Sequence, residues 1–386
     1  MKKRILTLLL VAVMIFGLVA CGGDKKEDAD KKDDKSAEEP AKEEKEDVKE
    51  EKEEKAEEKA EEPAEDEEKA EEPAAETKDY KIGVSLFELT AYTWFQGAIE
   101  GCHNWMDDHG EANGVNFTFT FEDSSSDVQT MLNNIENLVA SGSNGIILFP
   151  ADASSAIPLM KEYTSQGIPF VIGDYMQDPA SEEDIVWSTF VGHDMKALGV
   201  KAGEVAVDYL DTLGKDDPVC LFITSPASGQ VTQDRYNGFA ETILAKYPNA
   251  TIIEEGDTGA ANRDSAQTLM ENILQREDTI DVVCGHNDAL VVGAYNASVA
   301  NGRDEIKFIG IAGDKDVLTW LSEGNEQWLA EVLQDPVVLG YQATDAMYRA
   351  LVLGEELPEV YELPQPEAIT PENIDESGWQ DWVWIG

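Results

Sequence analysis

The chain after Lys78 alternates between short apolar runs and longer segments whose apolar residues recur every three or four positions. Short apolar runs bounded by polar residues are typical of buried strands, and the three-to-four spacing predicts amphipathic helices between them. The clearest helix is expected at 126–140, where one face carries Val128, Met131, Leu132, Ile135, Leu138 and Val139. Strands are expected at 81–86, 116–122, 145–150, 169–174, 186–192, 219–225, 251–257, 281–286, 307–313 and 328–334.

This order of strands and helices predicts an α/β fold in which helices pack around parallel sheets. About 300 residues with this many strands are more than one sheet usually holds, so two lobes of ordinary size are expected. Ligands of open parallel sheets bind beyond the carboxyl ends of the strands. Two lobes that face each other would form a cleft lined by the polar residues that follow the predicted strands, which are Asp174, Asn287, Asp288 and Gln334.

Residues 1–21 have the composition of a secretory signal. Three basic residues at positions 2–4 precede an apolar run at 5–16, and small residues follow. The run is shorter than the ~20 residues of a membrane-spanning helix. The end of the segment, LVAC, resembles the bacterial lipoprotein box, and an ordinary signal peptide with a chance cysteine is the alternative. We expect acyl chains such as palmitate on Cys21 to anchor the protein to the outer face of the cell membrane.

Residues 22–78 form a second segment, composed almost entirely of Glu, Asp, Lys and Ala with three prolines. Such a composition buries too little apolar surface to offset the entropy of an ordered chain, so a disordered tether is expected. Glu and Lys three or four positions apart favour transient helix, which the prolines interrupt. A flexible chain of this length spans about 40 Å, enough to hold a folded domain clear of a cell-surface layer.

The part of the chain after the tether is itself strongly acidic. Of the formal net charge of −50, residues 24–78 supply only about −14, from about 27 acidic and 13 basic residues. A negative surface repels nucleic acid and anionic lipid. We therefore expect no nucleic-acid partner, and solubility explains the charge better than a cationic ligand does.

The stretch CGHND, which begins at Cys284, places a thiol, an imidazole, an amide and a carboxylate close together. A zinc site needs further ligands at suitable spacing, and none follows. Cys102 and Cys220 show no CxxC or disulfide spacing either. We expect Cys284 inside a strand, His286 at its end and Asp288 in the first turn of a helix, where the helix dipole favours a carboxylate. No metal, cofactor or catalytic group is expected.

Several short stretches of the chain occur in an order that resembles the type I periplasmic sugar-binding proteins, such as the ribose- and galactose-binding proteins. They are KIGVSL, WFQGAIEG, GIILFP, PFVIGD, VGHDMKALGVKAGE, RYNGF, HNDALVVGA and LQDPVVLGY. The resemblance implies two doubly wound parallel-sheet lobes joined by three hinge crossings. It places the N-terminal lobe at 79–191 plus 335–362 and the C-terminal lobe at 192–334 plus 363–386. It also implies a monomer that closes on a small ligand and delivers it to an ABC permease.

The same resemblance implies a set of ligand-binding residues. Trp94 and Phe95 would stack on the apolar face of a sugar ring, and packing in the core is the alternative for both. Sugar hydroxyls both donate and accept hydrogen bonds, and the residues implied as their partners are Asp174, Arg235, Asn287 and Gln334. The alternatives for these four are local: a turn residue, a surface charge, a helix N-cap and a strand-end residue, respectively.

The chain departs from the family pattern in three places. Ile311-Ala312-Gly313 stands where an aspartate is common, the neighbourhood of Ala261 lacks an aromatic residue, and Tyr175 replaces an arginine of ribose-binding proteins. These departures predict a less charged and roomier pocket than that of a ribose or galactose specialist. A larger sugar, a disaccharide, a polyol or a furanose signal molecule stays open. Further candidates for ligand contact are Glu88, Tyr92, Tyr175, Asp288 and Asp314.

These features together predict an extracytoplasmic substrate-binding lipoprotein that captures a sugar or sugar-like ligand for an ABC permease, and not an enzyme. A surface sensor that signals to a membrane receptor would share the fold and the pocket, so it stays an alternative. A surface hydrolase is disfavoured, because neither G-x-S-x-G nor HExxH occurs. A transcriptional repressor is excluded by the export signal and by the lack of a basic DNA-reading helix.

Overall fold

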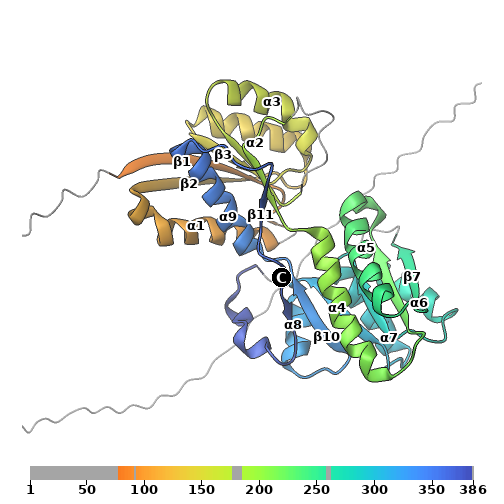
Figure 1. Cartoon of the computed structure of the whole chain (residues 1–386). Coiled ribbons are helices and arrows are strands. Elements are labelled where there is room, and N and C mark those ends of the chain that lie inside the picture. The colour runs from red at the N-terminus through yellow and green to blue at the C-terminus, as the bar shows by residue number, and fades with distance from the viewer. Residues whose placement is uncertain (1–76, 91–92, 176–184, 258–261, 385–386) are drawn as a thin grey trace, which may run out of the picture. The chain divides into compact units, whose positions relative to one another are not determined.

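The structure is a computed structural model that describes residues 77–90, 93–175, 185–257 and 262–384. Cys21, the tether, Tyr92 and Ala261 lie outside the described residues. The contacts of the chain separate residues 71–386 from the first 70 residues as one compact unit. The described residues of this unit form two six-stranded sheets (Figure 1).

The first sheet has the strand order β11-β5-β4-β3-β1-β2, and its strands are paired in parallel. Its strands are β1 (Lys78–Leu86), β2 (Val115–Asp123), β3 (Gly145–Leu148), β4 (Phe170–Gly173), β5 (Thr189–Gly192) and β11 (Val360–Glu362). The helices that accompany it are α1 (Trp94–Asn113), α2 (Val128–Ala140), α3 (Ala153–Ser165) and α9 (Pro336–Tyr348), the last followed by η3 (Arg349–Leu353).

The central strands β3 and β4 of this sheet are buried on both faces. Ile147 of β3 belongs to the apolar core under α1 and α9, whereas its neighbours Ile146 and Leu148 belong to the core under α2 and α3. Successive side chains of a strand point to opposite faces, so a strand covered on both sides has to be apolar throughout. This explains why β3 and β4 appear in the sequence as continuous apolar runs.

The second sheet has the strand order β12-β10-β9-β8-β6-β7, and β12 alone among the described strands pairs antiparallel. Its strands are β6 (Val219–Thr224), β7 (Thr251–Gly256), β8 (Val282–Gly285), β9 (Lys307–Ala312), β10 (Trp328–Leu333) and β12 (Ala368–Ile369). One face packs on α4 (Met195–Leu213) and α5 (Gly229–Lys246). The other packs on α6 (Arg263–Leu274), α7 (Asp288–Ala300), α8 (Lys315–Ser322) and the short helices η4 (Ile374–Glu376) and η5 (Trp379–Asp381).

The chain passes between the two sheets three times, from β5 to α4, from β10 to α9 and from β11 to β12. The predicted fold class, two doubly wound α/β lobes with three crossings, is confirmed. The lobe boundaries stay a prediction; the described strands follow them except that β1 starts at Lys78 and β5 ends at Gly192, each one residue beyond the expected bound.

The predicted strands correspond in order to β1–β10, and the helix expected at 126–140 is α2. The buried face of α2 also contains Asn134, a polar residue that the apolar pattern did not include. Asn134 can be buried there because its Nδ2 donates to the carbonyl of Asp123. The strands β11 and β12 were not expected. They have three and two residues, so they carry too short a pattern to be read from the sequence.

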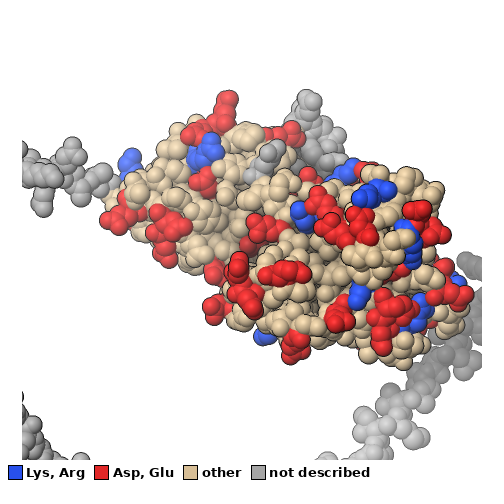
Figure 2. Space-filling view, turned by 60° about the horizontal axis from the view of Figure 1, so that its bottom comes forward, with Lys and Arg blue, Asp and Glu red and all other residues tan. Residues whose placement is uncertain are grey.

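Acidic side chains are scattered over the face shown in Figure 2 and outnumber the Lys and Arg side chains among them. Several of these bases form surface ion pairs, such as Lys196 with Glu241 and Arg349 with Glu355. Exposed pairs of this kind stabilise a fold by about 0–1 kcal/mol, so the surface charge serves mainly to keep the unit in solution. Within the described ranges, no helix is long and apolar enough to cross a membrane.

Candidate functional site

Three of the predicted ligand-binding residues meet where the two lobes touch. Asp174 follows β4 of the N-terminal lobe, Arg235 lies on α5, and Gln334 follows β10 of the C-terminal lobe. The amide of Gln334 joins them, because its Nε2 donates to Asp174 Oδ1 at 3.1 Å and its Oε1 accepts from Arg235 Nη2 at 2.5 Å. The structure therefore brings residues that are 160 and 99 positions apart into one hydrogen-bonded set.

Arg235 is held from several sides. Its side chain is 4% exposed, its Nη1 donates to the carbonyl of His286, and its Nη2 also contacts the sulfur of Met195. The backbone of α5 touches α4 at this point, because a Cβ atom on Gly199 would collide with the carbonyl oxygen of Arg235. A glycine at position 199 thus lets the two helices approach closely enough to fix the guanidinium at the end of β8.

Asp174 has an uncommon backbone conformation. Its φ is +69°, in the left-handed region that residues other than glycine seldom occupy, and its amide donates to the carbonyl of Val191 at 2.9 Å. A strained residue of this kind persists only where the surrounding structure holds it, and such residues gather at binding sites. The strain here turns the carboxylate away from the strand and toward Gln334.

Burial shifts the pKa values of the two ionisable residues in this set, Asp174 and Arg235. Burial raises the pKa of Asp174 to about 6, against the opposing effects of Arg235 and Gln334. Burial likewise lowers the pKa of Arg235 to about 10, although Asp174 and Asp288 counteract it. Both groups therefore carry charge at neutral pH, and Asp174 is poised to take up a proton in mildly acidic solution.

The two predicted aromatic residues differ in their surroundings. Trp94 is half-buried at the start of α1, contacts the cores of both lobes, and donates its indole N–H to the carbonyl of Gln334 at 2.8 Å. Phe95 is 5% exposed and packs edge-on against Trp94 and Phe149 in the core of the N-terminal lobe. Trp94 thus lies next to the polar set, whereas Phe95 packs in the core against Trp94. Contact of either ring with a ligand stays a prediction.

Asn287 and Asp288 start α7, as the N-cap alternative for Asn287 and the first-turn position of Asp288 predict; contact of either with a ligand stays a prediction. Asn287 is the N-cap, and its Oδ1 accepts from the amide of Leu290 at 3.2 Å. Asp288 is buried, and its Oδ2 accepts from the amides of Gly313 and Asp314 at 3.0 Å each. Asp288 therefore braces the loop after β9.

A second carboxyl group, which the sequence did not single out, faces Asp288. Glu331 on β10 is completely buried, and its Oε2 and Asp288 Oδ1 both point at the space above Gly310, where a Cβ atom would collide with either oxygen. Burial and the charge of Asp288 raise the pKa of Glu331 well above its usual range. Burial and the charge of Asp314 raise the pKa of Asp288 to about 7. The alternating pattern around Glu331 reads as an ordinary strand, so the sequence carries no signal for this pair.

The other lower-ranked candidates bind mainly to the protein itself. Glu88 accepts from the amide of Thr90 at 2.7 Å and from the hydroxyl of Ser126 at 3.2 Å. Asp314 caps α8 and pairs with Arg263 at 2.8 Å. Tyr175 directly follows Asp174 and is half-buried. Tyr92 lies outside the described residues, so a role for each of the four stays a prediction.

The stretch that begins at Cys284 forms a strand end and a helix start. The strand β8 ends at Gly285, one residue before the predicted end at His286. Cys284 is fully buried, and burial raises its pKa, so its thiol stays protonated. Burial lowers the pKa of His286 to about 3, which keeps the ring neutral. Among the described residues, no group of three or more His, Cys, Asp and Glu side chains is arranged to hold a metal ion.

His193 was missed by the sequence reasoning, although it lies beside the site. It stands at the crossing from β5 to α4, and its Nε2 lies 3.1 Å from the carbonyl oxygen of Asp335 at the crossing from β10 to α9. Burial lowers the pKa of its ring to about 4, so the uncharged ring links two crossings. Its only signal in the sequence is its place after a predicted strand.

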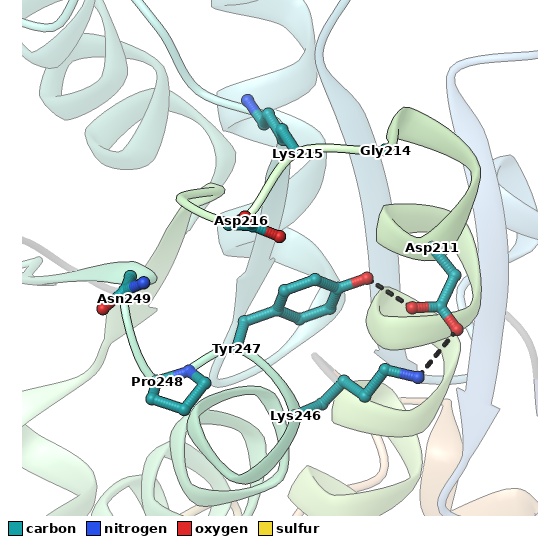
Figure 3. Close-up of a pocket in the computed structure, with 8 residues that line it drawn as sticks. All are labelled: Asp211, Gly214, Lys215, Asp216, Lys246, Tyr247, Pro248 and Asn249. Atoms are coloured by element: carbon teal, nitrogen blue, oxygen red, sulfur yellow. Dashed lines mark hydrogen bonds and ion pairs between the residues drawn. The ribbon is translucent and has the colours of Figure 1, made fainter.

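A separate surface pocket of about 410 Å³ lies at the far ends of α4 and α5 (Figure 3). Among its lining residues, Asp211 accepts from Lys246 at 3.1 Å and from the hydroxyl of Tyr247. The charges that line this pocket neutralise one another, and none of the predicted site residues contributes to it. The set formed by Asp174, Arg235 and Gln334 is therefore the better candidate site.

Comparisons with known proteins bear on this arrangement. The periplasmic binding protein domain matches residues 82–356 of the chain. The chain is 29% identical over 305 residues to the xylitol-binding protein of Mycolicibacterium smegmatis, which covers 78% of this chain and 80% of that protein. It is 28% identical over 225 residues to the ribose import binding protein RbsB of Bacillus subtilis, which covers 58% and 68%, respectively.

A similar solved structure is that of an ABC transporter solute binding protein from Mycobacterium smegmatis with bound glycerol. Its TM-score is 0.62 at 25% sequence identity, and the match covers 77% of this chain and 96% of that one.

Proposed function

Because the chain belongs to the periplasmic binding protein family, we propose that it is an extracytoplasmic solute-binding protein that captures a sugar or polyol between its lobes and delivers it to an ABC permease. The observation that carries this proposal is the polar set of Asp174, Gln334 and Arg235, which is assembled from both lobes beside Trp94. Relatives named for xylitol and ribose and a neighbour with bound glycerol support a ligand rich in hydroxyl groups.

The chemistry of the set suits such a ligand. A hydroxyl group both donates and accepts hydrogen bonds. The carboxylate of Asp174 can accept from it, the guanidinium of Arg235 can donate to it, and the amide of Gln334 can do either. In the structure these groups bond to one another. A polyol that enters the set replaces those bonds, and a molecule that lacks the hydroxyls leaves buried groups unpaired at ~1–3 kcal/mol each.

The lobes supply the transport mechanism. A ligand that contacts Asp174 on one lobe and Arg235 on the other makes all its bonds only when the lobes are together. It therefore shifts the equilibrium of the protein toward that state. A permease that recognises surfaces on both lobes then receives only loaded protein.

The proposal includes the location of the protein. A lipid on Cys21 and a tether at 22–78 would keep a monomeric binding unit at the outer face of the membrane, with lobes at 79–191 plus 335–362 and 192–334 plus 363–386. The signal-like composition of residues 1–21 and the family's extracytoplasmic setting support this location. A sensor that reports its ligand to a membrane receptor would use the same site; a permease gene beside this one would favour transport.

The experiment is a thermal-shift screen of residues 71–386 against pentoses, hexoses, polyols and inositols. A ligand at 100 times its dissociation constant adds ~2.7 kcal/mol to the free energy of unfolding, which is seen as a rise in melting temperature. We expect a polyol or sugar to cause that rise, and Arg235→Gln to abolish it. Asp211→Asn, in the separate pocket of Figure 3, is the matched control and keeps it. If no member of the panel raises the melting temperature, the proposed ligand class is wrong.

A further inference from the structure

The C-terminal segment ends beside the candidate site. Trp384, the last described residue, is 2% exposed and stacks on Trp382 with ring centroids 4.9 Å apart. Its ring belongs to the apolar core of the C-terminal lobe, together with Trp379 and residues of α7 and α8. This segment therefore moves with the C-terminal lobe.

The same tryptophan reaches the N-terminal lobe. The hydroxyl of Thr93, which directly precedes Trp94, donates to the backbone carbonyl of Trp384 at 2.9 Å. The indole lies between two glycines: a Cβ atom on Gly97 of α1 would be 2.8 Å from its Cδ1, and one on Gly313 after β9 would be 2.6 Å from its Cζ3. One edge of the ring thus faces each lobe, and neither position has room for a side chain.

The hydrogen bond of Thr93 differs from what its position predicts. A threonine at the N-cap of a helix usually accepts a hydrogen bond from an amide of the first turn. Thr93 is the N-cap of α1, yet its side chain makes no capping bond, and its hydroxyl donates to Trp384 instead. The start of α1, which carries Trp94, is therefore joined to the other lobe through the hydroxyl of its N-cap residue.

We propose that Trp384 is a positioning residue for ligand binding: it holds the start of α1, and with it Trp94, against the C-terminal lobe, and so sets how readily the lobes come together. This inference rests on the proposed function for its link to a ligand. Trp94 donates to Gln334, and Gln334 bridges Asp174 and Arg235, so the contact at Thr93 is continuous with the ligand set. Loss of that contact keeps all the predicted ligand-binding side chains in the chain and weakens the state in which the lobes touch.

The test measures the distance between the lobes without ligand. Labels are attached to cysteines introduced by Asp107→Cys on α1 and Glu323→Cys after α8, both at exposed positions, in residues 71–386. This unit contains all four apolar cores, so it is expected to fold without the first 70 residues. Its native cysteines are buried and burial raises their pKa values, so they do not compete for the label.

Thr93→Val removes the donor at little change in size, and Trp384→Ala removes the ring. We expect both substitutions to shift the distance distribution toward longer distances. Thr93→Ser keeps the hydroxyl, so it should leave the distribution as in the native protein. Val383→Ala is the matched control, because Val383 lies on the same segment and its side chain is 62% exposed. If Trp384→Ala does not fold, the two substitutions of Thr93 still decide the question.

Titration with xylitol and D-ribose completes the test. We expect Thr93→Val to raise the dissociation constant of whichever of them binds by roughly two- to tenfold, the range for one hydrogen bond. An unchanged distance distribution in Thr93→Val overturns the inference, whether or not a ligand binds. A shifted distribution in a protein that binds no sugar or polyol supports the inference and refutes the proposed function instead.

Discussion

The buried acid pair of the C-terminal lobe allows a sharp test through Glu331→Gln. The change replaces one carboxyl group by an amide of nearly equal shape, which can donate to Asp288 without ionising. In the native protein the pair loses protons as the pH rises, although both side chains lie out of water above Gly310. Asp314 adds negative charge nearby, and its partner Arg263 offsets part of it. The substitution therefore removes a charge that folding has to bury.

The sign follows from the pKa shifts. Both carboxyl groups have pKa values raised in the folded state, that of Asp288 to about 7. Their contribution to stability is therefore fully present below pH 4, the range of an unfolded carboxyl group, and is lost as the pH rises through 7. A shift of about three pKa units corresponds to roughly 4 kcal/mol at most, and relaxation of the site makes about 1–3 kcal/mol more realistic. Glu331→Gln keeps part of that free energy at high pH.

The assay is thermal melting of both proteins at pH 4.5, 6 and 8. We expect Glu331→Gln to melt several degrees above the native protein at pH 8, since 1 kcal/mol shifts the melting temperature by ~2–4 °C in a domain of comparable size. At pH 4.5 the two should differ little. Glu356→Gln, at an exposed position, controls for the loss of one surface charge. The reasoning would be refuted if the variant had a lower melting temperature than the native protein at pH 8. It would also be refuted if the two melting temperatures differed by the same amount at all three pH values.

Three further predictions concern the site. Affinity for the sugar or polyol should fall as the pH drops below about 6, because Asp174 takes up a proton and no longer accepts; calorimetry at pH 5 and 7.5 checks this, and Asp174→Asn should remove the dependence. Trp94→Phe loses the bond from the indole N–H to Gln334 and should weaken ligand binding by about 0.5–1.5 kcal/mol; equal affinity would exclude a role for that bond. Gly199→Ala places a methyl group against the carbonyl of Arg235 and should lower the free energy of unfolding by about 1–3 kcal/mol in urea, whereas native stability would mean that α4 and α5 can separate freely.

The predictions from sequence and the structure agree best where the signal is local. The apolar patterns located β1–β10 and α2, and the N-cap weighed for Asn287 follows from the preference of short polar side chains for helix starts. The strands β11 and β12 form because they pair with β5 and β10, respectively. Their own sequences carry no strand pattern, so they could not be predicted.

The candidate site was predictable only in part. A polar residue after a strand points to the correct edge of the sheet, which is how Asp174 and Gln334 could be proposed. The sequence does not show that the amide of Gln334 bridges Asp174 and Arg235, or that Phe95 is buried while Trp94 contacts both lobes. Glu331 and Trp384 had no such signal, and His193, which also follows a predicted strand, was not selected by it.

The sequence by itself determined the elements, the two-lobed α/β class and the chemical types available at the strand ends, because those depend on residues a few positions apart. Only the tertiary structure decided which of those groups meet. Thr93 and Trp384 are 291 positions apart, and their contact exists because three crossings return the chain to the same place. Hydrogen bonds and burial depend on the distance between groups in space. Once the chain has crossed between sheets, the number of residues between two groups no longer indicates that distance.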